Sequence, residues 1–190
     1  MEGYSEDPDQ RAVGGDYENG HHSPRNLMCT TFPDELRLSN DFKSKVFSVA
    51  LEPGPAIFSA GHTGNCAYWF DPRTGNWITS TYYTENLPEW VNNFNNKHLA
   101  DIYLAQEWNP LLPIDKYTES LPDNNKYETG YGGRITFPYA LTELSGSTKK
   151  QKNYGILAKT PFGNLLTKDF VSSLVVGEEL GKDEYTDILM

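Results

Sequence analysis

The chain has 190 residues, 37% of them hydrophobic and 22% charged, which is the composition of a folded domain and excludes disorder throughout. Its formal net charge of −10 repels phosphate backbones and argues against a nucleic-acid scaffold. No apolar run approaches the roughly 18 residues of a membrane-spanning helix, so no membrane span is predicted.

The first third of the chain predicts a loop, a helix and a buried strand. Residues 1–33 lack periodicity and are rich in Gly, Asp, Asn and His, which is typical of an irregular loop. Residues 34–42 are compatible with a short helix, and residues 44–51 give the strongest strand signal. Because this strand is apolar on both faces, we expect it inside a parallel sheet. Residues 52–55 (EPGP) end the strand, and α/β proteins bind ligands in the loop at such a strand end.

A hairpin and two helices are predicted next. The strand-like runs 67–71 and 76–83 are joined by a short turn that contains a glycine, which indicates a β-hairpin. Pro88 is typical of a first helical position, and a second helical pattern covers residues 97–108. The asparagines around Asn95 predict a break between these two helices.

The last third of the chain predicts an irregular segment, a helix and a strand. Residues 109–155 are rich in Pro and Gly, and we expect a functional or capping excursion there. Residues 165–180 restore a helical pattern, with Thr167 as the expected N-cap. Residues 185–190 predict a second strand; because the chain stops within it, we expect a piece of a larger protein with an open sheet edge. The expected apolar stripe of the helix is Phe170, Val171, Leu174 and Val175.

No complete active site is recognisable from motifs. The phosphate-binding and dinucleotide-binding glycine motifs, the HExxH zinc motif and the GxSxG nucleophile elbow are all missing from the sequence. The densest polar cluster contains residue types that bind metal ions. Adjacent histidines rarely bind the same ion, however, so a solvated loop is the favoured interpretation. His62, between strand-like runs, is interpreted as a structural, hydrogen-bonding histidine. The cluster consists of Asp16, Glu18, His21 and His22.

Aromatic residues in and after the predicted hairpin leave a second function open. They could form a platform on which a carbohydrate stacks, although at strand spacing such residues more often form the hairpin core. The platform interpretation would make the chain a stand-alone module that binds a carbohydrate or a peptide. The residues are Trp69, Trp77, Tyr82 and Tyr83.

An ordered set of stretches resembles a known enzyme family. The stretches are VGGDYENGHHSPRNL (13–27), TTFPDELRLSNDFKSKVFSVAL (30–51), AIFSAGHTGNCAYWFDPRTGNWITSTYY (56–83), LPEWVNNFNN (87–96), TPFGNLLTKDF (160–170) and YTDILM (185–190). In this order they resemble bacterial metal-dependent phosphatases of the type I phosphodiesterase/nucleotide pyrophosphatase family, within the alkaline phosphatase superfamily. The resemblance covers nearly the whole chain, and no single motif carries it.

The resemblance implies a fold, a chemistry and a location. The fold would be part of an α/β/α sandwich with an inserted cap region that contains a β-hairpin and helices. The parent would hydrolyse a small-molecule phosphate ester with two zinc ions and a Thr or Ser nucleophile. In such enzymes the nucleophile and the zinc ligands lie outside the matched segment, so the chain is expected to hold none of them and to be inactive alone. The implied location is periplasmic or secreted, and the implied partner is the rest of the parent chain.

One departure from the family concerns the loop after the strand 44–51. Members that hydrolyse monoesters carry a Lys there and, two residues on, an Arg, which grip the phosphate oxygens. The corresponding residues here are Glu52 and Gly54. Because a monoester has more charge to neutralise than a diester, we expect the parent to favour phosphodiesters or pyrophosphate-type bonds. Two alternatives stay open: another loop supplies the cation, or the alignment slips by one residue.

These inferences divide the chain into three parts. Residues 1–51 would hold the loop, the short helix and a core strand, residues 52–155 an inserted region that faces the substrate, and residues 156–190 a core helix and strand. The leading interpretation is a segment of a zinc-dependent phosphodiesterase or phosphatase that shapes the substrate pocket. Its candidate substrate-binding residues are Glu52 and Gly54.

Overall fold

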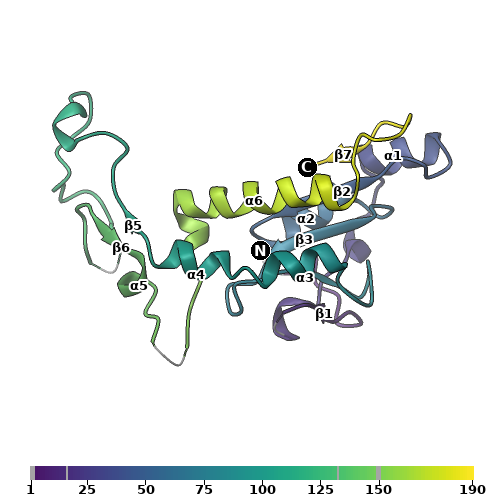
Figure 1. Ribbon diagram of the computed structural model, residues 1–190, viewed down its shortest axis with the longest axis horizontal. Helices are drawn as coiled ribbons and strands as arrows, with labels where there is room; N and C mark the ends of the chain where they lie inside the picture. The colour runs from purple at the N-terminus through teal and green to yellow at the C-terminus, as the bar shows by residue number, and fades with distance from the viewer. Residues whose placement is uncertain (1–2, 16, 132, 149–150) are drawn as a thin grey trace.

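A five-stranded sheet forms the centre of the computed structural model, which describes residues 3–15, 17–131, 133–148 and 151–190 (Figure 1). β2 runs parallel to β3 on one side and to β7 on the other. β3 and β4 form an antiparallel hairpin, and β1 pairs antiparallel with β4. The interior strand and the hairpin predicted from the sequence are confirmed. In sheet order the strands are β1 (Ala12–Val13), β4 (Trp77–Ser80), β3 (Cys66–Phe70), β2 (Val46–Ala50) and β7 (Ile188–Leu189).

Helices cover both faces of this sheet. Successive strand residues point to opposite faces, so Ala67 and Trp69 pack against α2, whereas Tyr68 and Phe70 pack on the face covered by α6, α3 and α4. The three layers are those of the α/β/α sandwich expected from the sequence. The helices are α1 (Phe32–Ser39), α2 (Pro53–Ala60), α3 (Glu89–Asn95), α4 (Leu99–Leu104) and α6 (Pro161–Gly177), with 3₁₀ helices η1 (Tyr17–Asn19), η2 (Pro24–Asn26) and η4 (Leu157–Lys159).

α2 begins immediately after β2, where the sequence predicted a loop. Pro53 and Pro55 both lie in its first turn, where the missing N–H group costs no intrahelical hydrogen bond. The prolines that end the strand therefore start a helix that the sequence analysis did not predict. Gly61, directly after the helix, has φ +72, a conformation that glycine adopts without strain.

α3 and α4 confirm the two predicted helices and the break between them. His98, at the start of α4, has φ 49, a left-handed conformation that interrupts the helical path. Asn95 ties this junction to the sheet: its Oδ1 accepts a hydrogen bond from Trp77 N at 2.9 Å, and its Nδ2 donates to Trp77 O at 2.9 Å. The break therefore also fixes the position of β4.

α6 begins at Pro161, well before the N-cap that the sequence suggested at Thr167. The N-cap residue is Thr160, and the Thr167 hydroxyl donates to Gly163 O at 2.9 Å inside the helix. The expectation was wrong because a glycine in the first turn weakens the helical signal there. Val175, expected in the apolar stripe, is 39% exposed. The buried residues of α6 are Gly163, Leu166, Phe170 and Leu174.

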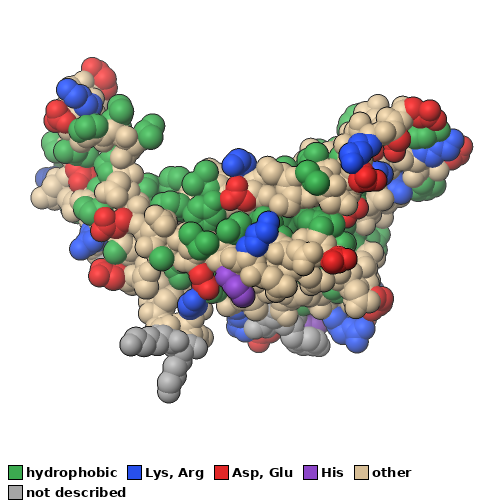
Figure 2. Space-filling model, viewed as in Figure 1, with side chains coloured by type: hydrophobic (Ala, Val, Ile, Leu, Met, Phe, Trp, Pro, Cys, Tyr) green, Lys and Arg blue, Asp and Glu red, His purple; other side chains and the backbone are tan. Residues whose placement is uncertain are grey.

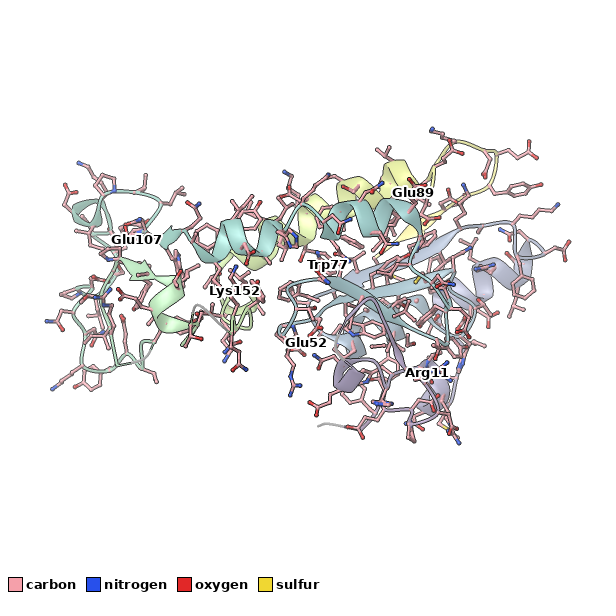
Figure 3. The ribbon with its side chains drawn as sticks, turned by 60° about the horizontal axis from the view of Figure 1, so that its bottom comes forward. Arg11, Glu52, Trp77, Glu89, Glu107 and Lys152 are labelled. Carbon is pink, nitrogen blue, oxygen red and sulfur yellow. The ribbon has the colours of Figure 1, made fainter. Side chains whose placement is uncertain are left out.

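Residues 107–146 form a lobe that stands away from the sheet (Figures 1 and 3). β5 (Glu107–Trp108) pairs antiparallel with β6 (Tyr139–Ala140), and η3 (Ile114–Lys116) and α5 (Leu141–Leu144) complete the lobe. The sequence predicted irregular structure from residue 109 onward, and the helix predicted as far as residue 108 is wrong at its end, because α4 ends at Leu104 and residues 107–108 form β5. The hairpin expected within an inserted region belongs instead to the central sheet, because β3 pairs directly with β2. The lobe is the part of residues 52–155 that is separate from the sheet.

The face of the molecule seen in Figure 2 has charged side chains at its two ends and more hydrophobic side chains between them. Acidic and basic side chains gather on the outer end of the lobe and around α1, whereas hydrophobic side chains gather where the lobe meets α6. None of the described helices is long and apolar enough to cross a membrane.

Candidate functional site

The candidate site lies where β2 ends and α2 begins. Glu52 is the N-cap residue of α2; its side chain makes no capping hydrogen bond and is exposed. The carboxyl ends of β2, β3 and β7 all lie at this edge of the sheet because the three strands are parallel. In α/β folds ligands bind at this edge. Figure 3 shows Glu52 on the side of the core that faces the lobe.

The first turn of α2 offers few groups that attract an anion. A helix N-terminus normally presents four free N–H groups together with the positive end of the helix dipole. Pro53 and Pro55 carry no N–H, so two of the first four residues have nothing to donate. Glu52 adds a carboxylate in front of this turn, where it stabilises the helix and repels an anion. A phosphate of high charge is therefore disfavoured at this helix start.

Gly54 is buried beneath the ring of Tyr4. A Cβ atom at position 54 would collide with the Tyr4 hydroxyl and lie 2.6 Å from the ring carbon Cζ. The Tyr4 ring packs in turn on Phe58 of α2, with ring centroids 5.1 Å apart. No side chain can occupy position 54 while Tyr4 holds this place. The two candidate residues thus meet at the strand end, but Gly54 contributes only its backbone.

Arg73 is a basic side chain at the same edge of the sheet. It lies in the turn between β3 and β4, directly after the carboxyl end of β3. Asp71 shapes this turn, because its buried carboxylate accepts hydrogen bonds from Arg73 N at 3.0 Å and from the Thr74 hydroxyl at 2.7 Å. The Arg73 guanidinium pairs with Glu18. If another loop supplies a cation, Arg73 is the candidate, and it already has an acidic partner.

The polar cluster of the N-terminal loop does not converge on one point. Asp16 lies outside the described residues, and Glu18 pairs with Arg73. His22 Nδ1 lies 3.2 Å from the Ser5 hydroxyl oxygen, and burial lowers the pKa of His22 below its ordinary value. Within the described ranges, no three His, Cys, Asp or Glu side chains are grouped as a metal site requires.

The other residues singled out from the sequence are structural. His62 Nε2 lies 3.1 Å from Leu27 O, which confirms a hydrogen-bonding histidine, and its carbonyl accepts the Tyr82 hydroxyl at 2.8 Å. Trp69 and Trp77 are 1% and 0% exposed. They offer no face on which a sugar ring could stack, so the predicted aromatic platform is wrong at both tryptophans, whereas Tyr82 is 38% exposed.

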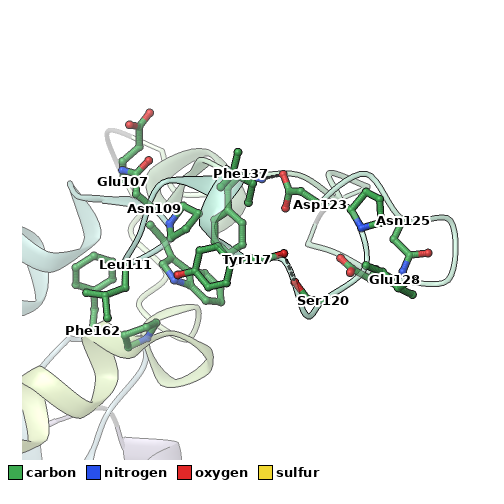
Figure 4. Close-up of a pocket in the computed structure, with 16 residues that line it drawn as sticks. Glu107, Asn109, Leu111, Tyr117, Ser120, Asp123, Asn125, Glu128, Phe137 and Phe162 are labelled. Atoms are coloured by element: carbon green, nitrogen blue, oxygen red, sulfur yellow. Dashed lines mark hydrogen bonds between the residues drawn. The ribbon is translucent and has the colours of Figure 1, made fainter.

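A second feature near this edge is an apolar hollow of about 1250 Å³ in the lobe (Figure 4). One of its walls is Phe162, next to Gly163, whose position lies against Leu51 at the end of β2. Leu111, on another wall, is 93% exposed. The first turn of α6 therefore links the hollow to the end of β2, and the hollow presents apolar surface to water. The charged side chains on its described walls are all acidic: Glu107, Asp123 and Glu128.

Two residues of this site carried no usable sequence signal. Tyr4 lies in a segment without periodicity and far from Gly54 in the chain, so only the folded structure brings them together. Arg73 lies in a turn whose sequence indicates only the hairpin. The start of α2 had a signal that was available, because proline is common in the first turn of a helix.

Comparison with known proteins shows similarity to alkaline phosphatases over almost the entire chain. The chain is 45% identical over 170 residues to alkaline phosphatase PafA of Elizabethkingia meningoseptica. It is 42% identical over 186 residues to alkaline phosphatase PhoV of Synechococcus elongatus. It is also 42% identical over 189 residues to a protein of Myroides odoratus that is named a calcium-transporting ATPase. No family model matches the chain.

The solved structures of PafA have the same fold over this region. The crystal structure of wild-type PafA matches with a TM-score of 0.88 and 42% identity, covering 98% of this chain and 36% of PafA. A PafA variant with several substitutions matches with the same TM-score at 43% identity. The chain spans about a third of the length of the relatives it matches. The resemblance to the alkaline phosphatase superfamily is confirmed, whereas the finer assignment to the type I phosphodiesterase/nucleotide pyrophosphatase family stays a prediction.

Proposed function

We propose that the chain is a segment of a metal-dependent phosphoric ester hydrolase, which shapes the substrate pocket and is inactive alone. The similarity to PafA over 98% of the chain, at a TM-score of 0.88, is the observation that carries this proposal. Because the match covers only 36% of PafA, the remaining parts of the enzyme would come from the rest of the parent chain. A periplasmic or secreted location is proposed from the family resemblance.

The catalytic groups are proposed to lie in the rest of the parent chain. The family resemblance implies two Zn²⁺ ions and a Thr or Ser nucleophile. The described residues do not fit a zinc site, because no three potential ligands are grouped among them. The contribution of this chain is therefore the wall of the pocket at the end of β2.

The substrate we propose is a phosphodiester or a pyrophosphate-type bond rather than a monoester. Three features at the strand end support this choice: the carboxylate of Glu52, the absence of a side chain at Gly54 and the two prolines in the first turn of α2. Each of these features either deprives the protein of a positive charge or a hydrogen-bond donor near the phosphate, or places a negative charge there. A dianionic monoester loses more from these changes than a monoanionic diester.

Hydrolysis by the complete parent protein tests this proposal. We expect zinc-dependent turnover of bis(4-nitrophenyl) phosphate to exceed that of 4-nitrophenyl phosphate in kcat/KM. Glu52→Lys should raise the monoester-to-diester ratio of kcat/KM about tenfold, because it replaces a negative charge near the phosphate with a positive one. A tenfold change corresponds to ~1.4 kcal/mol of interaction between these charges. Glu184→Lys makes the same charge change at an exposed residue before β7, at the opposite end of that strand, and should leave the ratio unchanged. An equal change in both variants would contradict a local role for Glu52.

The lobe is proposed to cap the active site together with the rest of the parent chain. Its hollow is bounded on one side by Phe162 of α6, next to Gly163, which lies against Leu51 at the end of β2. The hollow also presents side chains that a protein rarely leaves in water. Exposed apolar residues of the lobe are Leu111, Leu112, Ile114, Leu121 and Tyr127. Polypeptide outside these 190 residues is the partner that the comparison with longer relatives suggests for this surface.

A further inference from the structure

Tyr4 occupies the space that a side chain at position 54 would need. Its hydroxyl and ring lie against the Gly54 backbone in the first turn of α2, so close that even a Cβ atom would collide with them. A residue that comes from the N-terminal segment thus takes the place of a side chain of α2. The group at this point of the strand end is a phenol.

The Tyr4 side chain is held in position and is still accessible. Its ring packs on Phe58 with centroids 5.1 Å apart and an interplanar angle of 33°. The residue is 42% exposed. No hydrogen bond to the Tyr4 hydroxyl is found among the described residues. A partly exposed ring that is fixed in this way can bind a ligand with little loss of side-chain entropy.

The Tyr4 hydroxyl is a side-chain donor that lies against the first turn of α2. Pro53 and Pro55 have no N–H, and Glu52 can only accept hydrogen bonds when it is ionised. A phenol donates one hydrogen bond without bringing a positive charge. That combination suits a phosphoryl group with one negative charge better than one with two.

We propose that Tyr4 is a specificity-determining residue that binds the substrate, its hydroxyl donating a hydrogen bond to a non-bridging phosphoryl oxygen at the β2–α2 junction. This inference rests on the proposed function and adds to it the residue that replaces a cation at position 54. Tyr4 would thereby favour monoanionic esters, while Glu52 disfavours dianionic ones.

Removing only the hydroxyl tests this role in the complete parent protein. We expect Tyr4→Phe to lower kcat/KM for bis(4-nitrophenyl) phosphate about tenfold or more, as for a lost hydrogen bond to a charged group, with an unchanged Tm. Tyr185→Phe is the matched control, because Tyr185 lies before β7, at the end of that strand opposite to the candidate site. It should leave both values unchanged. If the parent turns over only the monoester, the same variants are compared on that substrate.

The packing of Tyr4 on Gly54 is tested separately through stability. Gly54→Ala should lower the Tm of the parent, because its Cβ collides with Tyr4. In a Tyr4→Gly background the same substitution should raise the Tm or leave it unchanged, since the space is then free and alanine is the better helix former. Equal effects in both backgrounds would overturn the arrangement on which the inference depends.

The outcomes separate this inference from the proposed function. Wild-type turnover with an unchanged kcat/KM in Tyr4→Phe would overturn the role of Tyr4 and leave the proposed function intact. Wild-type turnover of neither ester in the presence of zinc would overturn both. A loss of activity in Tyr4→Phe that is matched by Tyr185→Phe would show that the hydroxyl has no specific role.

Discussion

Asp34 is a fully buried carboxylate that joins α1 to the loop after α2. Its Oδ2 accepts hydrogen bonds from the backbone N and hydroxyl of Thr31, and its Oδ1 from those of Thr63, at 2.7–3.0 Å. Burial alone would raise the pKa of Asp34, but these hydrogen bonds outweigh it and hold the pKa below its ordinary value. The charged form therefore stabilises the fold.

We expect Asp34→Asn to lower the free energy of unfolding by ~2 kcal/mol at pH 7, because a charged acceptor is lost. A depressed pKa stabilises the folded state above the unfolded pKa of about 4, and this contribution disappears as pH falls through the folded pKa. The difference between wild type and variant should therefore shrink between pH 5 and pH 3. Urea unfolding of both proteins across this range checks the prediction, and a difference independent of pH would contradict it.

The two residues of the candidate site differ in how far the sequence could reveal them. Glu52 follows an apolar strand and precedes two prolines, so both its place at the strand end and its charge were predictable. The surroundings of Gly54 were not, because Tyr4 reaches it only through the fold of the N-terminal loop. A contact between residues so far apart in the chain leaves no periodicity or spacing in the sequence.

α6 supplies a fully buried ring to the aromatic cluster on its face of the sheet. Phe170 is 0% exposed and stacks on Trp77, with centroids 4.6 Å apart, and its ring also contacts Tyr68, Trp90 and Phe94. We expect Phe170→Ala to lower the free energy of unfolding of the chain by about 3–5 kcal/mol, because it opens a cavity at the centre of this layer.

A control on the same helix separates this packing from helix propensity. Val176 is 73% exposed, and Val176→Ala should change the free energy of unfolding by less than about 0.5 kcal/mol. Urea denaturation of the two variants beside wild type measures both effects. Similar losses in the two variants would mean that α6 is not held by the ring cluster.

The sequence predicted α3, α4 and the interior of α6, but it missed α2 and misplaced the start of α6. The break between α3 and α4 followed from asparagines that favour non-helical conformations. The first turns of α2 and α6 contain Pro and Gly, which weaken a helical pattern, yet both residues are tolerated where backbone N–H groups have no intrahelical partner. At Gly163 the glycine is required, because a Cβ would lie 2.6 Å from Leu157 O.

At the scale of the whole molecule, the sheet could be predicted only in part. The parallel pairing of β2 was indicated by its apolar faces, and the order of the strands came from the structure. The short pairing of β5 with β6 joins residues more than thirty positions apart, so no local sequence pattern predicts it. The lobe therefore appeared irregular in the sequence although an aromatic cluster around Trp108 supports it.

The exposed apolar surface of the lobe leads to a prediction about the complete parent protein. Leu111 is 93% exposed on the wall of the hollow, and Glu119 is an exposed acidic residue of the same segment. If the rest of the parent chain covers the hollow, a cysteine at Leu111 should react with a maleimide at least about tenfold more slowly than a cysteine at Glu119, since labelling then requires local opening. The background needs Cys29→Ser, because Cys29 is exposed and Cys66 is buried.

The labelling experiment distinguishes three occupants of the hollow. Protection of the Leu111→Cys variant at every protein concentration, without substrate, supports coverage by the parent chain itself. Protection that appears only at high protein concentration would mean a second copy, and protection that appears only with a phosphate ester would make the hollow part of the substrate site. Equal labelling of Leu111→Cys and Glu119→Cys under all conditions would show that the lobe stays open, and the proposal that it caps the active site with the rest of the chain would fail.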